Sequence, residues 1–377
     1  MQMKRFGLCA ALSAAALLLL AGCAGSGSTA APTLTVESSY PLQYAKQFTV
    51  DECTGGYELI TIADSQYLVV PQGAAVPEDL PQGTTVLQQP IENIYLVSTS
   101  AMDPIISLGA LDSIALSGTK ADGWYLPEAK AAMQAGQIAY AGKYSAPDYE
   151  TILASGCGLA IENTMIYHTP EVKEQLEKFG IPVLVERSSY ETDPLARMEW
   201  VKLYGILLGK KQEAEQLFDT QVQRVAPLEN QQPTGKSVAF FSITSNNLVT
   251  VRKGSDYVAR MIEMAGGSYV FDDLTDSGNN LATINLSLED FYAGAKDADV
   301  LLYNSTIEGS IASTEQLVEK CPLLAQFKAV QNGNVWCTAQ SLFQQSMELP
   351  DLILDMNRVF TEGTPADSEL TFLTHVE

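Results

Sequence analysis

The chain has 377 residues and a formal net charge of −23, from 45 acidic and 22 basic side chains. Nucleic-acid binding is excluded by this balance, because phosphate contacts need clusters of Lys and Arg. A length of about 350 residues beyond an N-terminal leader suits two domains of ordinary size.

The N-terminal residues predict a secretory signal peptide over residues 1–22. A basic start at Lys4 and Arg5 precedes an uncharged apolar run over residues 6–20, which is shorter than the ~20 residues that span a bilayer as a helix. The run ends in Leu-Ala-Gly before Cys23, which resembles the bacterial lipobox, where the thiol receives a diacylglycerol and becomes the new N-terminus. An ordinary signal peptide with an incidental cysteine is the alternative.

A flexible tether over residues 23–33 and a small antiparallel sheet are predicted next. The stretch Ser26–Pro32 consists of small and polar residues, as linkers do. Three short β-rich segments follow, with turn residues at Gly55-Gly56 and Asp64-Ser65 between them, which is typical of a meander. These segments are Phe48–Val50, Tyr57–Ile62 and Tyr67–Val70.

From residue 92 onward, short apolar strands alternate with helices, which predicts a parallel sheet and an N-terminal α/β lobe over residues 34–208. The clearest helix spans Pro170–Phe179, with Thr169 as its cap, Pro170 at its first position and Gly180 after its end. The five strands are expected at Ile94–Val97, Ile114–Leu116, Ile138–Ala141, Leu159–Ile161 and Val183–Val185.

A helical region from Pro194 to Asn230 separates this lobe from a second alternating set. Gly205 and Gly209 are possible breaks in it, and we assign residues 209–232 to a connecting helix. A C-terminal α/β lobe over residues 233–377 follows. Its expected strands are Val238–Ile243, Leu248–Val251, Val300–Tyr303 and Val335–Cys337; its helices are Tyr257–Ala265 before Gly266-Gly267, a helix to Ala295 with a Ser287/Asp290 capping box, and Met347–Phe360.

The predicted fold class is therefore α/β, with two Rossmann-like lobes joined by a single long helix. Ligands of open α/β sheets gather at the carboxyl ends of strands, and small-molecule sites favour domain interfaces. Both rules predict a ligand cleft between the lobes.

Sequence motifs for catalysis or metal binding are missing. Only two histidines occur, His168 and His375, and there is no GxSxG, HExxH or zinc-like cysteine spacing. Gly235-Lys236-Ser237 lacks the glycine of a phosphate loop at position 230 and precedes a strand, so we interpret it as a lysine at a strand start. A pair of catalytic carboxylates stays open, since nothing singles out two of the 45 acids.

Four cysteines remain beyond Cys23, at positions 53, 157, 321 and 337. They allow three disulfide pairings, among which the sequence does not choose. Cys157 and Cys321 are also compatible with buried free thiols, which are the common case.

Taken together, these features resemble the substrate-binding lipoproteins of ABC importers, in the subgroup that binds iron-siderophores, haem or cobalamin. The resemblance implies ligand binding without catalysis, no cofactor, and delivery of the ligand to a permease and its ATPase. Four stretches carry the likeness: YAGKYSAPDYE (140–150), PEVK with FGIPV (170–183), DPLARMEWVK (193–202) and YVARMIEMAGG (257–267).

The site residues follow from strand ends and from this resemblance. Large flat chelates bind well to aromatic walls, and an arginine could meet an anionic ligand. Each aromatic residue taken alone is also compatible with the core. The candidates for ligand contact are Trp124, Tyr125, Tyr144, Arg252, Tyr303 and Trp336.

In that family, one exposed Glu on each lobe meets the permease, and the nearest positions here are Glu171 and Glu263. Glu171 also favours the dipole of the helix in whose first turn it lies, and Glu263 departs by a few residues from the expected position.

We therefore expect a monomeric, lipid-anchored protein on the extracytoplasmic face of a membrane, in a periplasm or on the outer surface. Its expected ligand is a ferric siderophore, haem or a corrinoid, and the scarcity of histidine favours the first and last of these. A sensory or adhesive lipoprotein without a permease is the main alternative, and a surface hydrolase is another.

Overall fold

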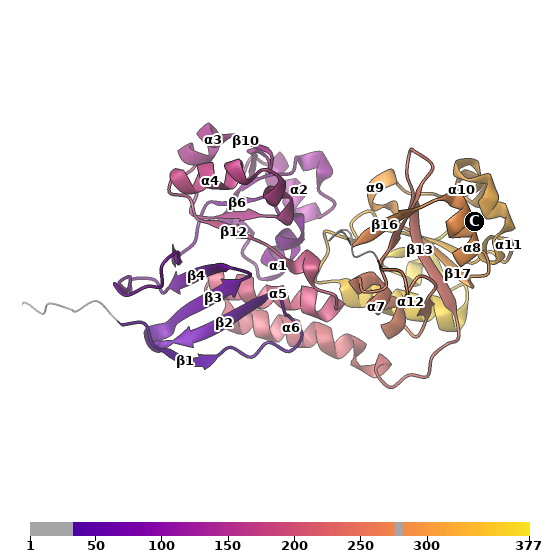
Figure 1. Ribbon diagram of the computed structural model, residues 1–377, viewed down its shortest axis with the longest axis horizontal. Coiled ribbons are helices and arrows are strands. Elements are labelled where there is room, and N and C mark those ends of the chain that lie inside the picture. The colour runs from indigo at the N-terminus through magenta and orange to yellow at the C-terminus, as the bar shows by residue number, and fades with distance from the viewer. Residues whose placement is uncertain (1–32, 276–281) are drawn as a thin grey trace, which may run out of the picture.

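The computed structural model describes residues 33–275 and 282–377. Two α/β lobes lie side by side, with a pair of helices below the N-terminal lobe that reaches to the C-terminal lobe, and with an N-terminal sheet at one end of the molecule (Figure 1). Cys23, the signal peptide and most of the tether lie outside the described residues. Within the described residues, no helix combines the length and the apolar composition that a membrane span requires.

The N-terminal sheet has five strands in the order of the chain, and the predicted meander is confirmed for its first four, which pair antiparallel. The fifth strand runs parallel to the fourth. One face of the sheet packs on the helical region, where the Phe48 ring lies 4.9 Å from that of Trp200. The strands are β1 Val36–Ser39, β2 Phe48–Cys53, β3 Tyr57–Ile62, β4 Ser65–Val70 and β5 Thr85–Gln88.

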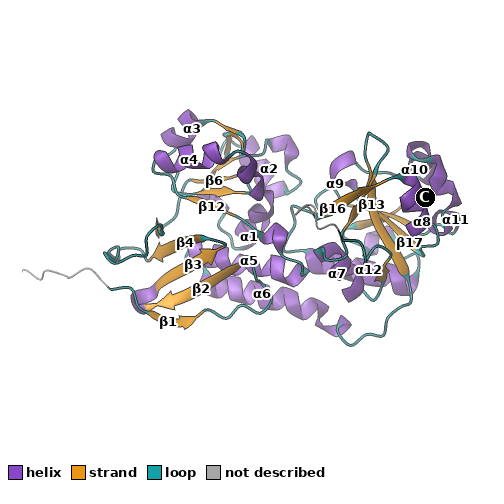
Figure 2. Cartoon of the chain, viewed as in Figure 1, coloured by secondary structure: helices purple, strands orange, loops and turns teal. Residues whose placement is uncertain are grey.

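Five parallel strands form the main sheet of the N-terminal lobe, in the order β12-β11-β6-β7-β8. The expected strands are all present, and helices lie between most of them (Figure 2). The elements are β6 Ile94–Leu96, α1 Met102–Ser107, β7 Ile114–Ser117, α2 Pro127–Gln134, β8 Ala139–Tyr140, the hairpin β9 Gly142–Lys143 and β10 Ala146–Pro147, α3 Tyr149–Ala154, β11 Ala160–Glu162, α4 Pro170–Lys178 and β12 Val183–Val185.

The start of α4 differs in one respect from the prediction. Pro170 occupies its first turn and Gly180 follows its end with a φ of 79°, as expected. Thr169 does not cap the helix through its side chain, however, because its ψ of 60° departs from the extended backbone of a capping residue. Its hydroxyl oxygen is buried without a partner among the described residues.

The helical region consists of two helices, α5 (Pro194–Leu207) and α6 (Lys211–Val225), which pack against each other. The predicted break at Gly209 is confirmed, since its φ of 68° turns the chain between them. The break at Gly205 is wrong, because this residue lies inside α5. A side chain at Gly205 would collide with Ala214 of α6, so the glycine allows the two helices to approach closely.

The C-terminal lobe contains a mixed sheet in the order β16-β14-β13-β17-β18-β19, with β15 beside β13. The predicted capping box is confirmed, since the Ser287 hydroxyl accepts a hydrogen bond from the Asp290 amide at 3.0 Å. The elements are β13 Ser237–Ile243, β14 Val249–Arg252, α7 Tyr257–Met264, β15 Ser268–Tyr269, β16 Thr283–Leu286, α8 Leu288–Ala295, β17 Val300–Tyr303, α9 Ser305–Glu308, α10 Thr314–Lys320, α11 Lys328–Gln331, β18 Val335–Thr338, α12 Leu349–Glu362 and β19 Leu373–His375.

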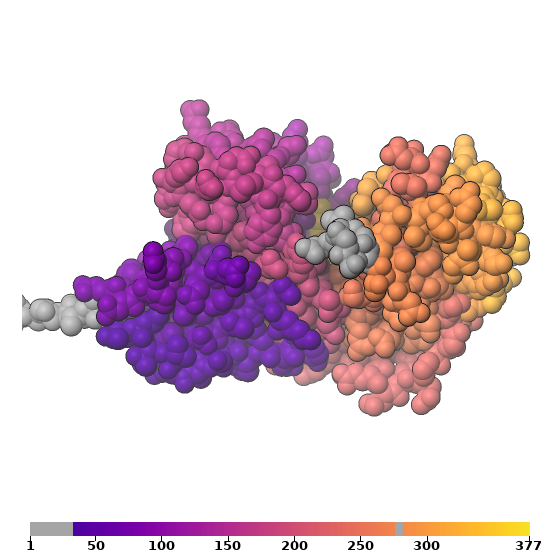
Figure 3. Space-filling view, in the orientation of Figure 1, coloured from indigo at the N-terminus to yellow at the C-terminus, as the bar shows by residue number. Residues whose placement is uncertain are grey.

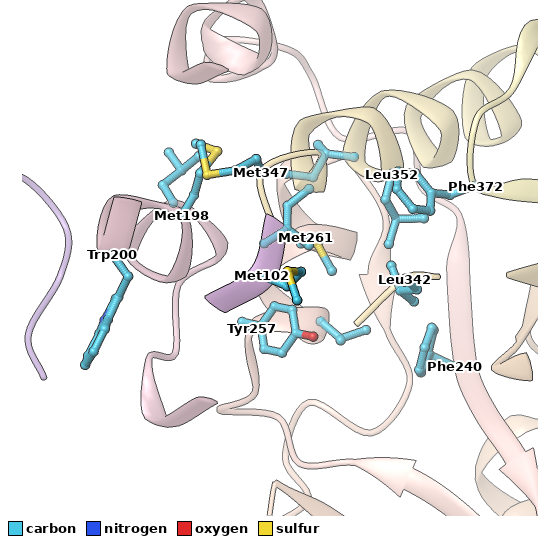
Figure 4. Close-up of a cluster of buried hydrophobic side chains, with 14 of the residues drawn as sticks. Met102, Met198, Trp200, Phe240, Tyr257, Met261, Leu342, Met347, Leu352 and Phe372 are labelled. Atoms are coloured by element: carbon cyan, nitrogen blue, oxygen red, sulfur yellow. The ribbon is translucent and has the colours of Figure 1, made fainter. Parts of the chain in front are cut away.

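The lobes meet through a buried apolar cluster that is rich in methionine (Figure 4). Met102 of α1 and Met198 of α5 pack with Met261 of α7 and with Met347, which precedes α12. Methionine side chains are flexible and fill irregular spaces, so this junction tolerates small adjustments. The predicted α/β fold of two lobes is confirmed.

Candidate functional site in the cleft between the lobes

The two lobes touch through the loops at the carboxyl ends of their strands. From the C-terminal lobe, the Gln344 side chain accepts a hydrogen bond from the Tyr125 amide and donates one to the Gly123 carbonyl, both at 2.8 Å. Nearby, the Ser346 hydroxyl donates to the Ser100 carbonyl at 2.9 Å. Gly123 and Tyr125 follow β7 and Ser100 follows β6, whereas Gln344 and Ser346 follow β18. These contacts therefore form the floor of the predicted cleft, above which the lobes separate (Figure 3).

Exposed apolar side chains gather at the strand ends of both lobes. Of the ten most exposed large apolar residues in the described part of the chain, six lie at the ends of strands that point toward this edge or in the segments that follow them. Isolated exposed apolar residues are ordinary, but a concentration of them marks a binding surface. The six are Tyr125, Tyr140, Met165 and Tyr167 in the N-terminal lobe, and Leu248 and Ile307 in the C-terminal lobe.

A cavity of about 180 Å³ lies where the two lobes approach each other. Its wall combines residues that follow β12 with residues that follow β14 or precede β16. A second cavity of about 470 Å³ shares Thr192, Ser255 and Asp256 with it. The first cavity is lined by Ser189, Tyr190, Glu191, Thr192, Lys253, Ser255, Asp256 and Ala282.

Arginine residues concentrate around this junction in a chain that is otherwise strongly acidic. The Arg197 guanidinium lies 4.2 Å from the centre of the Tyr257 ring and donates to the Ser188 carbonyl at 3.2 Å. Arg252 lies over the Phe343 ring at 4.6 Å, with one nitrogen 3.6 Å from the Asp256 carboxylate. Burial raises the pKa of the Asp256 carboxyl, and the nearby Arg252 opposes that rise.

Sequence reasoning selected only Arg252 from this set. Four of the seven arginines of the chain fall in two short windows, residues 187–197 and 252–260. The structure brings the windows together, and Arg260 of the second lies 3.8 Å from Asp193 of the first lobe. The spacing of arginines along the chain was therefore an available signal for a place that accepts an anionic group.

Three predicted contact residues are corrected by the structure, because they belong to the packed interior and do not line the cleft. Trp124 is buried and donates through its indole nitrogen to the Ser117 hydroxyl at 3.2 Å. Tyr303 is fully buried in a central strand, and burial raises its pKa to about 12. Trp336 is also fully buried and packs on the His375 ring at 4.8 Å. Strands in the middle of a covered sheet are buried on both faces, so an aromatic residue near their ends still joins the core.

The other three predicted contact residues keep some exposure. Tyr125 is 44% exposed on the cleft floor. Tyr144 lies in the loop between β9 and β10, and Arg252 is largely covered by Phe343 and Asp256. Tyr125 and Arg252 come from opposite lobes and are connected through the segment that contains Phe343 and Gln344.

The two predicted docking residues lie in different settings. Glu171 is exposed in the first turn of α4 on the N-terminal lobe. Glu263 is exposed on α7, but its carboxylate pairs with Arg260 at 2.5 Å and lines the larger cavity beside the lobe junction.

A buried carboxyl group that sequence reasoning did not select lies at the carboxyl end of β11. Glu162 is fully buried, and neither of its carboxyl oxygens has a hydrogen-bond partner among the described residues. Burial raises its pKa to about 8, so the group is largely neutral at pH 7.

The disulfide pairings that the sequence left open are not formed among the described cysteines. Cys53, Cys157, Cys321 and Cys337 are free thiols, and Cys157 is partly exposed whereas the others are buried. In the described ranges 33–275 and 282–377, no three His, Cys, Asp or Glu side chains come together to hold a metal ion.

Comparison with known families decides the identity of the fold. A family model described as periplasmic binding protein matches residues 96–341, which is more than half of the chain. The chain belongs to the periplasmic binding protein family. Proteins of this family are non-enzymatic solute-binding proteins, so the predicted lack of catalysis and the resemblance drawn from the four stretches are both confirmed.

The individual relatives share only low sequence identity with this chain. An uncharacterised lipoprotein of Methanocaldococcus jannaschii is 27% identical over 241 residues, which cover 62% of this chain and 55% of the relative. The chain spans about half the length of the curated relatives it matches. The family and this lipoprotein relative support an extracytoplasmic location.

Solved structures share the fold at low identity. A periplasmic haem-binding protein of Vibrio cholerae superposes with a TM-score of 0.56 at 18% identity, over 73% of this chain and 99% of that one. An ABC-type Fe³⁺-hydroxamate transport protein of Saccharomonospora viridis gives 0.54 at 21% identity, over 72% and 94%. A periplasmic vitamin B12-binding protein of V. cholerae gives 0.51 at 15% identity, over 72% and 99%.

Proposed function

We propose that this periplasmic binding protein captures a ferric siderophore, haem or a corrinoid outside the cytoplasm and delivers it to an ABC importer. The observation that carries the proposal is the pairing of two features in one cleft. Exposed apolar side chains come from the strand ends of both lobes, and an arginine-rich junction lies beside them. A large, flat, partly apolar chelate with anionic groups uses both features.

The residues have separate roles in this proposal. Tyr125 and Tyr144 of the N-terminal lobe and Ile307 of the C-terminal lobe contact the apolar body of the ligand. Arg252 attracts its anionic group. The metal ion enters as part of the cargo, inside its chelator. Structures that share this fold include proteins named for binding haem or vitamin B12 and one named for Fe³⁺-hydroxamate transport, which supports a chelate or a tetrapyrrole as the ligand.

The protein is proposed to stay at the membrane surface through a lipid on Cys23 and to act as a monomer. A tether of about ten residues reaches at most about 35 Å when fully extended. The N-terminal sheet, where the described chain begins, therefore stays near the membrane and its permease. Glu171 and Glu263 are the proposed docking carboxylates, and charge reversal at both is expected to abolish transport while ligand binding persists.

A titration tests the binding proposal. The chain from residue 24 onward, without lipid, is titrated with haemin, cyanocobalamin and a panel of ferric siderophores, while tryptophan fluorescence and visible absorption are recorded. One compound is expected to give a saturable one-to-one response. Tyr125→Ala is expected to weaken that affinity about tenfold. Failure of every compound to bind the wild-type chain would contradict the proposed ligand class.

The control variant is Leu153→Ala. Leu153 lies at the far end of α3 and is 45% exposed, close to the 44% of Tyr125, but it does not follow a strand end that faces the cleft. Its removal is expected to leave the affinity unchanged. Equal losses in Leu153→Ala and Tyr125→Ala would show that the titration reports general surface adhesion.

A further inference from the structure

The segment after β18, residues 341–348, crosses from the C-terminal lobe to the N-terminal lobe and contacts it at several points. Gln344 and Ser346 bind backbone groups of the loops after β7 and β6, as described above. The Met347 amide also donates to the buried Asp103 carboxylate at 2.7 Å. We call residues 341–348 the crossing segment.

Gln344 uses both polar groups of its side chain in hydrogen bonds to the N-terminal lobe. Its carbonyl oxygen accepts from the Tyr125 amide and its amide nitrogen donates to the Gly123 carbonyl. Both bonds end on the backbone of residues 123–125. Two bonds to one short stretch restrain its orientation as well as its distance from Gln344. Glutamate supplies only the acceptor at neutral pH, and alanine supplies neither group.

The stretch that Gln344 holds is also anchored from within its own lobe. Trp124 points into the core, where its indole donates to the Ser117 hydroxyl, and that hydroxyl accepts from the Thr119 amide at 3.0 Å. With Trp124 fixed inward, the next side chain, Tyr125, projects outward to the cleft floor. The placement of Tyr125 therefore depends on one anchor from each lobe.

The neighbour of Gln344 in the crossing segment supports the candidate cation of the cleft. Phe343 lies under the Arg252 guanidinium at 4.6 Å. Two consecutive residues thus hold an apolar contact of the N-terminal lobe and a cationic contact of the C-terminal lobe.

We propose that Gln344 is a positioning residue that couples the orientation of the two lobes to the place of Tyr125 in the cleft. A rotation of the C-terminal lobe moves the crossing segment, and the two hydrogen bonds of Gln344 transmit that movement to Tyr125. Gln344 acts through Tyr125 and does not contact the ligand. The inference rests on the proposed function for the identity of the ligand, whereas the coupling itself is independent of it.

The first test needs no ligand. Hydrogen exchange of the intact domain is compared among wild type, Gln344→Ala, Gln344→Glu and the control Gln345→Ala. Gln345 is adjacent and partly buried, and its side chain makes no hydrogen bond within the described residues. Gln344→Ala is expected to speed exchange in residues 119–126 about tenfold, with exchange in the N-terminal sheet unchanged. Unchanged exchange in residues 119–126 would overturn the proposal.

The second test uses haemin, cyanocobalamin or a ferric hydroxamate, whichever binds the wild type. Gln344→Ala is expected to weaken binding about fivefold to tenfold, and Gln344→Glu by an intermediate amount. In a Tyr125→Ala background, Gln344→Ala is expected to cause no further loss, because it acts through that side chain. Losses that simply add would overturn the coupling. Failure of the wild type to bind any probe would count against the proposed function, while the exchange experiment would still decide the role of Gln344.

Discussion

The N-terminal lobe and its helices form two interfaces of opposite character. Against the N-terminal sheet, the buried Glu199 carboxylate accepts three backbone amides of the loop before β2 and pairs with Lys202 at 2.7 Å. Against the C-terminal lobe, the core is a methionine cluster bordered by single side-chain bridges such as Gln344. The first interface is held by buried carboxylates at its centre, whereas the centre of the second is apolar and filled by flexible methionine side chains. The second interface borders the proposed ligand cleft.

A second carboxylate reinforces the interface with the N-terminal sheet. Glu191 accepts the amides of Lys46 and Gln47 and the indole hydrogen of Trp200 at 2.9–3.1 Å. A buried charge is stable only when it is paired or well hydrogen-bonded, so these contacts hold the sheet in one position. The comparison teaches that the N-terminal sheet is attached through buried carboxylates, whereas the junction around the proposed cleft is built mainly from methionine side chains.

Removal of the Glu199 carboxylate from the interface with the N-terminal sheet should have the largest effect on stability. Glu199→Ala leaves Lys202 buried without its partner and three backbone amides unsatisfied, which is expected to lower the free energy of unfolding by about 3–5 kcal/mol. Urea unfolding measures it, with the exposed Glu213→Ala as the control. A loss below about 1 kcal/mol would show that this interface is not held by charge.

Glu162 sharpens the comparison, since it is a buried carboxyl without the donors that surround Glu199. Its pKa is raised from 4.5 to about 8, so between these values the folded chain retains a proton that the unfolded chain has lost. Stability is therefore fully present below pH 4.5 and falls as the pH rises through 8. Glu162→Gln is expected to remove that loss, roughly 2–5 kcal/mol at pH 8.5 in chemical denaturation. An unchanged pH profile in the variant would contradict this assignment.

The lobe junction is expected to respond to pH near Glu348. Burial, followed by the charge of the neighbouring Asp103 across the junction, raises the pKa of Glu348 to about 8. Other charges that act on the pair are Asp351 and Glu128, while Arg224 binds Asp351. The proton-dependent stabilisation is complete below pH 4.5 and is lost as the pH rises through 8.

Hydrogen exchange at pH 6 and pH 9, corrected for intrinsic rates, should therefore show loosening of residues 341–348 and not of residues 43–50. Glu348→Gln is expected to abolish that difference between the two pH values. Equal loosening of both segments would mean that the two interfaces do not differ in the way proposed.

A conservative change inside the methionine cluster should have the smallest effect. Met347→Leu keeps the volume of the side chain, and the backbone amide that binds Asp103 is retained. The expected loss of stability in a thermal melt is below about 1.5 kcal/mol. A loss of 3 kcal/mol or more, on the order of a core truncation, would mean that this junction is as tightly specified as the sheet interface.

Local sequence patterns predicted most of the fold, because helices, strands, caps and turns are determined largely by residues that are close in sequence. Alternation of strands and helices, the Ser287 cap and the Gly209 turn all lie within a few positions of the elements they define. The side-chain cap at Thr169 failed because one backbone angle decides it. Gly205 failed because its reason is a contact with Ala214 on the next helix.

The site was harder to predict because it depends on the directions in which side chains point and on contacts between residues that are far apart in the sequence. Trp124 and Tyr125 are adjacent aromatic residues in the loop after β7, yet the first fills the core and the second faces the cleft. Gln344 meets Tyr125 across 219 positions of sequence, and no local pattern marks that contact. Only the clustering of arginines in two windows offered a signal that could have been used.

The central claim is that one ligand is held between the two lobes, and a protection footprint tests it most directly. Hydrogen exchange is measured with and without a saturating chelate or tetrapyrrole that binds the wild-type domain. Protection is expected in the strand-end loops of both lobes, residues 119–126, 140–149, 244–248 and 304–309, with none in the N-terminal sheet. Protection confined to a single lobe, or to the sheet, would contradict the account.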